Sequence, residues 1–304
     1  MTLKSLPGIL STCFTAVLFA SVAHADDPAA LAGKRVVFVG DSITQAGGYV
    51  SFAAYYLEKQ NPDKQFDIIS VGLSSETVSG LSEPNHAGGR FPRPCLFERF
   101  GRVLEKTKPE VIFMCYGMND GIYLPLDDER FAAFKNGVNQ FIEMSKAAGV
   151  KEIYIITPPI FDFPPGETGF NYDTVLTAYA EWETAIKQPG VHVIDLHTPM
   201  SKARAARTEV YSKDRIHPGD EGHLFMARTI LQSLGMNIPD ESVATVKADP
   251  LYKQVDTLRR HRSGGWMNHI GYTREKTVEP QPLGDTETKA VEIRKTVDEL
   301  KSSL

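Results

Sequence analysis

The order of apolar and polar positions along the chain predicts strands that alternate with helices. Five short apolar runs have the length of strands buried on both faces, and they lie at residues 35–39, 66–71, 110–116, 152–157 and 191–196. Longer segments with helical spacing of apolar side chains lie at residues 49–58, 129–148, 174–187 and 219–234. This alternation predicts an α/β fold, namely a flavodoxin-like doubly wound sheet of five parallel strands with helices on both faces, an α/β/α sandwich.

The sheet pattern ends near residue 237, and a mostly helical pattern follows it. Helical spacing covers residues 242–262, a segment rich in Gly, Trp and Tyr comes next, and a last helix is predicted over 285–302. That helix carries a narrow apolar stripe of Ala290, Ile293, Val297 and Leu300. We expect the stripe to pack on the protein's own surface, with a partner's surface as the alternative. The predicted organisation is an α/β domain over residues 26–237 and a helical C-terminal extension over 238–304.

The first 25 residues have the organisation of a secretory signal peptide. Lys4 gives a short positive region, residues 9–22 are mostly apolar, and Ala23-His24-Ala25 is a small-residue cleavage site. A membrane anchor is the alternative, but the apolar run is short and polar residues interrupt it. We expect cleavage after Ala25, a secreted or periplasmic protein, and no integral membrane segment after cleavage.

Composition narrows the range of partners and cofactors. The chain has 304 residues, of which 42% are hydrophobic and 23% charged, as is ordinary for a globular protein. Its net charge is −5, and removal of Lys4 with the signal peptide makes it −6, so nucleic acid is not an expected partner. Cys95 and Cys115, which remain after cleavage, are too few for a disulfide framework. No metal-binding or nucleotide-binding motif is present, so we expect neither a metal site nor a bound nucleotide. The oligomeric state stays open.

Four short polar motifs follow predicted strands. They are Gly40-Asp41-Ser42, the turn from Gly72 to Thr77, Gly117-Met118-Asn119-Asp120, and Asp214-Arg215-Ile216-His217. The carboxyl ends of parallel strands lie at one edge of a doubly wound sheet, and ligands bind at that edge. We therefore predict that the four motifs meet at a single site.

The residue types in these motifs suit nucleophilic catalysis on an acyl group. Ser42 needs a base to act as a nucleophile, His217 is a suitable base, and Asp214 can hold one ring nitrogen of His217. Asn119 and backbone N–H groups of the Gly72–Thr77 turn can stabilise an oxyanion. Taken singly, each of these residues has an alternative role as a helix cap or turn residue. The order serine, aspartate, histidine also occurs in α/β-hydrolases, but their Gly-x-Ser-x-Gly elbow is absent from this chain.

The same motifs resemble those of the SGNH (GDSL-type) hydrolase family over about residues 34–235. Gly40-Asp41-Ser42 is similar to the family's first block, Gly117–Asp120 to its Gly-x-Asn-Asp block, and Asp214–His217 to its last block. The resemblance implies that Ser42, Asp214 and His217 form a catalytic triad. It further implies that Ser42 N–H and Asn119 donate to the oxyanion, and that an ester or thioester is hydrolysed without a cofactor.

The second block departs from the family pattern at one position. The family commonly has Asn-x-Gly-x-Ser-Gly-x-Thr, and this chain has Ser75 where the second of those glycines is expected. Because serine keeps the backbone N–H, we expect Ser75 to be the third oxyanion donor, with Gly72 as the fallback. A left-handed backbone at this position would be harder for Ser75 than for glycine.

The substrate is the least determined part of the prediction. Secreted members of the family often remove acetyl groups from polysaccharides, so the resemblance implies an esterified glycan or a small ester as the substrate. A long loop over residues 79–97 carries His86, Arg90 and Arg93. The candidates for substrate contact are Asp41, His86, Arg90, Tyr116 and Met118, with loop anchoring or core packing as the alternative. We expect a carbohydrate O-acetylesterase; a general carboxylesterase, lipase or thioesterase and a non-catalytic glycan-binding protein are the alternatives.

Overall fold

The computed structural model describes residues 28–164 and 166–303 and contains a central sheet of five parallel strands. The strands are β1 (Arg35–Gly40), β2 (Asp67–Gly72), β3 (Val111–Cys115), β4 (Glu152–Ile156) and β5 (Val191–Ile194), in the spatial order β2-β1-β3-β4-β5. Each neighbouring pair is parallel. This order confirms the predicted flavodoxin-like α/β fold, and its direction reverses at β1 and β3, where such sheets form a ligand-binding crevice.

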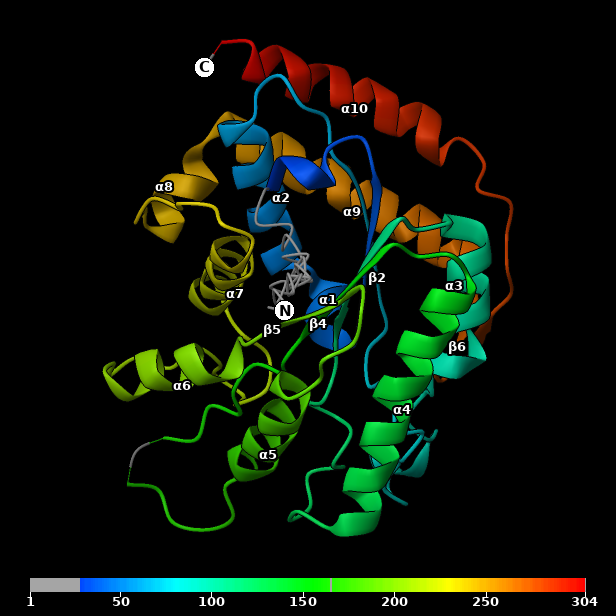
Figure 1. The fold of residues 1–304 in the computed structure, drawn as a ribbon, viewed down its shortest axis with the longest axis vertical. Helices are drawn as coiled ribbons and strands as arrows, with labels where there is room; N and C mark the ends of the chain where they lie inside the picture. Colours follow the sequence, from blue (N-terminus) through cyan, green and yellow to red (C-terminus); the bar gives the residue numbers. More distant parts are fainter. Residues whose placement is uncertain (1–27, 165, 304) are drawn as a thin grey trace, which may run out of the picture.

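Helices cover both faces of the sheet, as Figure 1 shows. The helices before β5 are α1 (Ser42–Ala46), α2 (Gly48–Gln60), α3 (Phe100–Thr107), α4 (Asp128–Ala147) and α5 (Asp173–Thr184). Those after β5 are α6 (His197–Ala205), α7 (Asp220–Ser233), α8 (Val243–Ala248), α9 (Pro250–Ile270) and α10 (Thr286–Lys301). A hairpin of β6 (Tyr272–Thr273) and β7 (Thr277–Val278) connects α9 to α10. Helices α2, α7 and α9 lie on one side of the strands, and α3, α4 and α5 lie on the other.

A row of aromatic rings crosses the side of the sheet that faces α2. Phe38, Phe113 and Tyr154 occupy matching register positions on β1, β3 and β4. Neighbouring rings in this row stack with centroids 4.5 Å apart. Tyr49 of α2 meets Phe38 edge-on. Because a one-residue slip would turn these rings to the opposite face, the row fixes the register and hence the residues at the carboxyl ends of the strands.

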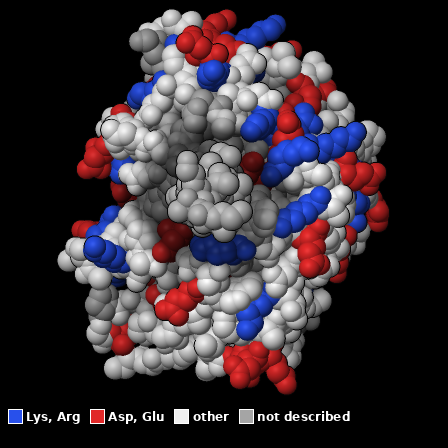
Figure 2. All heavy atoms as spheres, viewed as in Figure 1, with Lys and Arg blue, Asp and Glu red and all other residues white. Residues whose placement is uncertain are grey.

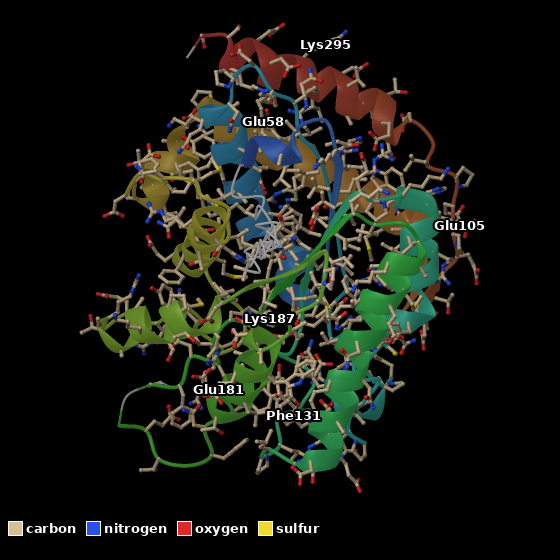
Figure 3. The ribbon with its side chains drawn as sticks, viewed as in Figure 1. Glu58, Glu105, Phe131, Glu181, Lys187 and Lys295 are labelled. Carbon is tan, nitrogen blue, oxygen red and sulfur yellow. The ribbon has the colours of Figure 1, made fainter. Side chains whose placement is uncertain are left out.

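Aromatic pairs also join the helices on the opposite side of the sheet. Phe100 of α3 stacks on Phe141 of α4 at 4.6 Å, and Phe134 of α4 stacks on Tyr179 of α5 at 4.0 Å. Phe131, labelled in Figure 3, stacks on the same tyrosine. Each such pair contributes about 0.5–1.5 kcal/mol beyond the burial of its area, so these contacts hold the three helices as one layer.

Sequence analysis located the strands to within one or two residues but missed three helices. Helices α1, α3 and α6 are the shortest in the α/β part, and their apolar period is too brief to be recognised. The helix expected over 242–262 is two helices, α8 and α9, and α9 continues to Ile270, into the segment rich in Gly, Trp and Tyr. Pro250 explains the break, because the preceding residue, Asp249, is held extended and caps α9.

The C-terminal helices pack on the rest of the molecule. Helix α9 contacts α2 and β2, and α10 lies along α9. Ala290 and Val297 of the predicted stripe are buried, so the stripe packs on the protein's own surface, as expected. Glu58 of α2, labelled in Figure 3, is also buried and accepts hydrogen bonds from Lys301 and Arg294 of α10. These ion pairs therefore join α10, the last helix, to α2, which packs directly on the sheet.

The surface and the cysteines have ordinary features. Figure 2 shows acidic and basic side chains interspersed over one face. Cys95 and Cys115 are free thiols, and burial raises the pKa of Cys115 well above its usual value. Within residues 28–164 and 166–303, no group of His, Cys, Asp and Glu side chains is arranged to hold a metal ion. None of the helices in these ranges is long and apolar enough to cross a membrane.

The predicted signal peptide, residues 1–25, lies outside the described residues.

Candidate active site

Two glycines allow the first two motifs to lie against each other. Gly40 and Gly72 are register partners at the ends of β1 and β2. A Cβ on Gly40 would lie 2.1 Å from Thr44 Oγ1, and one on Gly72 would lie 2.1 Å from Gln45 N. A larger residue at either position would therefore push α1 away from the sheet. Gly72, the fallback oxyanion donor, thus has a packing reason to be glycine.

Ser42 is the first residue of α1, which begins directly after β1. Asp41 caps this helix, because its Oδ1 accepts a hydrogen bond from Ile43 N at 2.9 Å. Burial of the Asp41 carboxyl raises its pKa from 3.8 to about 7. The N–H of Ser42 makes no hydrogen bond to any residue that the structure describes. Asp41 is therefore a buried cap, and both the hydroxyl and the N–H of Ser42 stand at the carboxyl end of β1.

His217 and Asp214 complete a hydrogen-bonded relay from Ser42. Ser42 Oγ is 2.8 Å from His217 Nε2, and His217 Nδ1 is 2.6 Å from Asp214 Oδ2. The other carboxylate oxygen of Asp214 accepts from Ile216 N at 3.0 Å and His217 N at 2.8 Å. One oxygen of Asp214 thus fixes the turn, and the other orients the imidazole with Nε2 toward the serine.

The Asp214–His217 turn brings acid and imidazole together within four residues. Arg215 has a φ of 71°, a left-handed conformation that reverses the chain direction between them. Burial opposes the charge on Asp214, but hydrogen bonds from the His217 side chain and from the two backbone N–H groups outweigh it and lower the pKa of Asp214. Asp214 is therefore ionised near neutral pH and able to stabilise a positive imidazole.

The relay is open to solvent on one side. The side chains of His217 and Asp214 are 49% and 55% exposed. A groove of about 950 Å³ runs beside them and is lined by Thr208, Glu209, Val210, Tyr211, Lys213, Gly219, Asp220, Glu221 and Val243. A groove of this size has room for the alcohol portion of a bulky ester.

The turn after β2 holds Ser75 in the left-handed region, with a φ of 68°. A serine is uncommon there, because its Cβ crowds the backbone and a glycine would not. The Ser75 N–H has no hydrogen-bond acceptor in the described part of the chain and is available to a ligand. Gln45 Oε1 accepts from the N–H of Ser74 at 2.7 Å and from its hydroxyl at 2.6 Å. The turn is therefore attached to α1, the helix that carries Ser42.

Hydrogen bonds fix which way the Asn119 amide points. Its Oδ1 accepts from Arg93 Nη1 at 2.9 Å and from the Tyr123 hydroxyl at 3.2 Å. Its Nδ2 donates to Glu76 O at 3.1 Å. An arginine can only donate, so the end of the amide beside Arg93 must be the oxygen. The second proton on Nδ2 has no partner among the described residues and remains free to bind a ligand oxygen.

A buried ion pair lies directly behind the Ser75 turn. Glu76 is fully buried and accepts from Arg99 Nε at 2.7 Å and from Arg99 Nη2 at 2.6 Å. Tyr116 donates its hydroxyl to the same carboxylate at 2.5 Å. Arg99 also donates to Val71 O at 2.9 Å. This network fastens the turn to the end of β2 and to the residue after β3.

Asp120 fastens the third motif to the loop that follows the Ser75 turn. Its Oδ1 accepts from Val78 N and Ser79 N at 2.8 Å each, and its Oδ2 accepts from Gly117 N at 3.0 Å. Burial raises the pKa of Asp120, although these hydrogen bonds oppose the rise. The Asn119 motif and the Ser75 turn are therefore one connected unit.

Sequence analysis proposed five residues as substrate contacts, and three of them are buried. Asp41, Tyr116 and Met118 are each 1% exposed, so the structure gives them capping, hydrogen-bonding or packing roles. His86 Nδ1 lies 3.0 Å from a carboxylate of its own loop. Arg90 is exposed and forms an ion pair at 3.1 Å with a carboxylate of the β6–β7 hairpin. For His86 and Arg90 the observed contacts are those of the loop-anchoring alternative.

The sequence did not show which residues support Asn119 and Ser75. Arg93 is 8% exposed, forms two hydrogen bonds to Glu83 at 2.6 and 2.7 Å, and lies 5.3 Å from the centre of the Tyr123 ring. Glu83 and Arg93 lie in a loop without periodicity, and Glu76 and Arg99 are 23 residues apart. These residues are distinguished by being charged and buried or partly buried, and burial is not visible before the fold is known.

Comparisons with known proteins agree with this geometry. A curated acetylxylan esterase from Geobacillus stearothermophilus is 22% identical over 232 residues, covering 67% of this chain and 94% of that protein. The crystal structure of a catalytic mutant of an acetylxylan esterase from the same organism matches with a TM-score of 0.50 at 20% identity, covering 69% of this chain and 98% of that one. At this identity the structural match establishes the fold. The sequence model of the GDSL-like lipase/acylhydrolase family matches residues 38–224, more than half of the chain and all four motifs. This protein therefore belongs to the GDSL-like lipase/acylhydrolase family and is a serine ester hydrolase.

Proposed function

We propose that this hydrolase is an exported carbohydrate O-acetylesterase in which Ser42 is the nucleophile, His217 the general base and Asp214 the group that orients His217. The observation that carries the assignment is the unbroken relay, with 2.8 Å between Ser42 Oγ and His217 Nε2 and 2.6 Å between His217 Nδ1 and Asp214 Oδ2. Both distances are within hydrogen-bond reach before any substrate binds, as proton transfer from the serine requires.

In the proposed acylation step, Ser42 Oγ attacks the carbonyl carbon of the ester. His217 Nε2 takes the hydroxyl proton as the bond forms, and Asp214 stabilises the imidazolium without itself becoming protonated. The tetrahedral intermediate collapses when the C–O bond to the alcohol breaks. His217 then gives its proton to the departing alkoxide, so that an alcohol leaves and an acyl-enzyme remains.

Deacylation repeats these steps with water as the nucleophile. His217 removes a proton from water, the hydroxide adds to the acyl carbon, and Ser42 leaves with the proton that His217 returns. In both tetrahedral intermediates the oxyanion accepts hydrogen bonds from the N–H of Ser42, the N–H of Ser75 and Nδ2 of Asn119. These donors are fixed before the reaction, which is the property that makes such sites effective.

Three observations support a carbohydrate acetyl ester as the substrate. The curated relative is an acetylxylan esterase. The groove beside His217 is open, and its lining, although mostly apolar, includes the charged side chains of Lys213, Asp220 and Glu221, which can bind the hydroxyl groups of a sugar. Ala23-His24-Ala25 follows an apolar segment in the manner of a signal peptide, and export would bring the enzyme to external polysaccharides.

The test compares the mature wild type with the Ser42→Ala variant on acetylated polysaccharides and on aryl esters of increasing acyl length. Released acid is measured, and the mass of the exported protein identifies its first residue. We expect acetate release by the wild type, a fall in kcat of roughly 10⁶-fold in the variant, a steep loss of activity beyond acetate, and a mature protein that begins at Asp26.

Other results would redirect the proposal. Activity confined to longer or simple esters would assign the protein to the general carboxylesterases, lipases or thioesterases. No acid release from any substrate would leave the glycan-binding alternative. Equal activity of wild type and Ser42→Ala would remove Ser42 from the mechanism altogether.

A further inference from the structure

The C-terminal extension reaches the Ser75 turn, although it lies outside the family match. That match ends at residue 224. The β6–β7 hairpin, which follows α9, carries Arg274 in its bend. Arg274 Nε donates to Ser74 O at 3.1 Å, and its Nη2 lies 3.4 Å from Ser75 Oγ. A side chain 200 residues away in sequence thus contacts the turn that carries the proposed oxyanion donor Ser75.

Further contacts hold Arg274 in place. Its guanidinium lies 4.8 Å from the centre of the Phe91 ring, which is buried. The next residue, Glu275, forms an ion pair with Arg90 at 3.1 Å. The loop over residues 79–97 therefore contacts both Arg274 and the neighbouring residue of the hairpin. Arg90, proposed from sequence as a substrate contact, is in this arrangement a tether for the hairpin.

Planarity of the peptide bond gives the contact to Ser74 O a specific consequence. The carbonyl of Ser74 and the N–H of Ser75 belong to one planar trans peptide group and point in opposite directions. A donor that holds the oxygen at one end therefore fixes the direction of the N–H at the other. Gln45 restrains the preceding N–H of Ser74 from α1, and Arg274 restrains this second peptide group from the β6–β7 hairpin.

The conformation of Ser75 explains why such a restraint is required. At a φ of 68° a glycine would be comfortable, but a serine favours other regions of backbone space. A cavity of about 400 Å³ separates α9 from the Gln45–Gly72 region, directly before the turn. Relaxation of Ser75 to a negative φ would rotate its N–H away from the site.

We propose that Arg274 is a positioning residue that holds the Ser74–Ser75 peptide group, and with it the Ser75 N–H, in the orientation that binds the oxyanion. The C-terminal extension then compensates for the serine that replaces the family's glycine. This inference rests on the proposed function, because it assumes that the Ser75 N–H stabilises the transition state of ester hydrolysis.

The test is a double-mutant cycle on an aryl acetate, with Arg274→Ala made in the wild type and in a Ser75→Gly background. In the wild type, loss of Arg274 should lower kcat by roughly 10- to 100-fold with less than about a twofold change in KM, because a misdirected donor affects the transition state alone. In the Ser75→Gly background the same change should cost less than about threefold, because glycine keeps the left-handed turn unaided.

Two further variants separate positioning from general stability. Lys295→Ala, which removes an exposed cation from α10 (Figure 3), should leave kcat and the melting temperature unchanged. Arg274→Lys, which keeps the charge but loses the planar fork, should retain only part of the activity. A crystal structure of the Arg274→Ala variant should show Ser75 outside the left-handed region, and this readout does not depend on catalysis.

The outcomes are decisive in both directions. An unchanged kcat in Arg274→Ala, a rise in KM alone, or equal losses in the serine and glycine backgrounds would each overturn the proposal. So would a variant structure in which Ser75 keeps its positive φ. A wild type without esterase activity would refute the proposed function instead, and the crystal structure would still decide whether Arg274 holds the turn.

Discussion

The two halves of the site are built in opposite ways. Asp214 and His217 come from one turn of four residues, and their side chains are about half exposed. On the oxyanion side, Ser75 and Asn119 depend on buried or half-buried partners drawn from distant parts of the chain, with Arg99 behind one and Arg93 behind the other. The first half is a local motif, and the second is a product of the tertiary fold.

The difference follows from what each half must do. A base has to accept and return protons and to let water and alcohol pass, so exposure is compatible with its task. Oxyanion donors act only if they are already aimed when charge develops, and aiming a backbone N–H requires support from several directions. We therefore expect changes on the triad side to affect activity alone, and changes on the oxyanion side to affect activity and stability together.

The largest effect is expected for His217→Ala. Without the base, kcat should fall by about 10⁴- to 10⁶-fold, as it does when one member of such a relay is lost. The free energy of unfolding should change by less than about 1 kcal/mol, because the side chain is half exposed. Initial rates on an aryl acetate and urea unfolding of the same preparation measure both quantities. A strongly destabilised variant would contradict the separation of activity from stability on this side.

Glu76→Gln is the corresponding change on the oxyanion side. It leaves the buried Arg99 guanidinium without its counter-charge, so the free energy of unfolding should fall by about 3–5 kcal/mol. Asp214→Asn is the matched control, since it also neutralises a carboxylate in an ion pair, but an exposed one, and should cost less than about 1 kcal/mol. Urea denaturation of the two variants compares them directly. Similar losses of unfolding free energy in both variants would contradict the view that only the oxyanion side contributes strongly to stability.

Asp41 lies where the two halves join, and its ionisation should appear in the pH dependence of stability. Burial raises its pKa from 3.8 to about 7, so the folded protein retains a proton that the unfolded chain releases near pH 4. This group's contribution to stability therefore falls as pH rises from about 4 to about 7. Asp41→Asn keeps the cap to Ile43 N but cannot ionise, so it should gain up to about 4 kcal/mol relative to wild type across that interval. Parallel stability curves from pH 4 to 7 would refute the assignment.

Asn119→Ala should have the smallest effect of the four, although still a clear one. Loss of one oxyanion donor is expected to lower kcat by roughly 10²- to 10³-fold, with KM little changed. Because Arg93 and Glu76 O lose a partner, stability should fall as well, unlike in His217→Ala. Steady-state kinetics combined with thermal unfolding tests both parts. A variant with normal kcat would exclude the Asn119 amide from the oxyanion site.

The same contrast determines how much the sequence could predict. The five strands and the Asp214–His217 pair were predicted because each depends on neighbours in sequence, as in Asp214-Arg215-Ile216-His217. Ser42 was predicted from the short motif Gly40-Asp41-Ser42 at the end of a strand, although it meets His217 across 175 residues. The expectation that a left-handed Ser75 would be unfavourable was sound physics, but the structure adopts that conformation and adds contacts from Gln45 and Arg274. Those contacts span 29 and 200 residues, and no periodicity marks either of them.

Two of the substrate candidates are buried for a related reason. Tyr116 and Met118 follow a strand, a position from which a side chain can face either a ligand or the core. Which of the two it faces depends on the covering helices and loops, and here both are buried. The break before α9 could have been predicted from the sequence, because Asp249-Pro250 is a recognisable helix start.

The most direct test of the account is to trap the nucleophile. The mature protein is treated with a sulfonyl fluoride, which sulfonylates an activated serine with loss of fluoride, and the labelled peptide is located by mass spectrometry. Our account predicts one adduct, on Ser42, that forms in parallel with loss of esterase activity and is absent from His217→Ala. Inactivation accompanied by a label elsewhere, or full activity with Ser42 labelled, would contradict it.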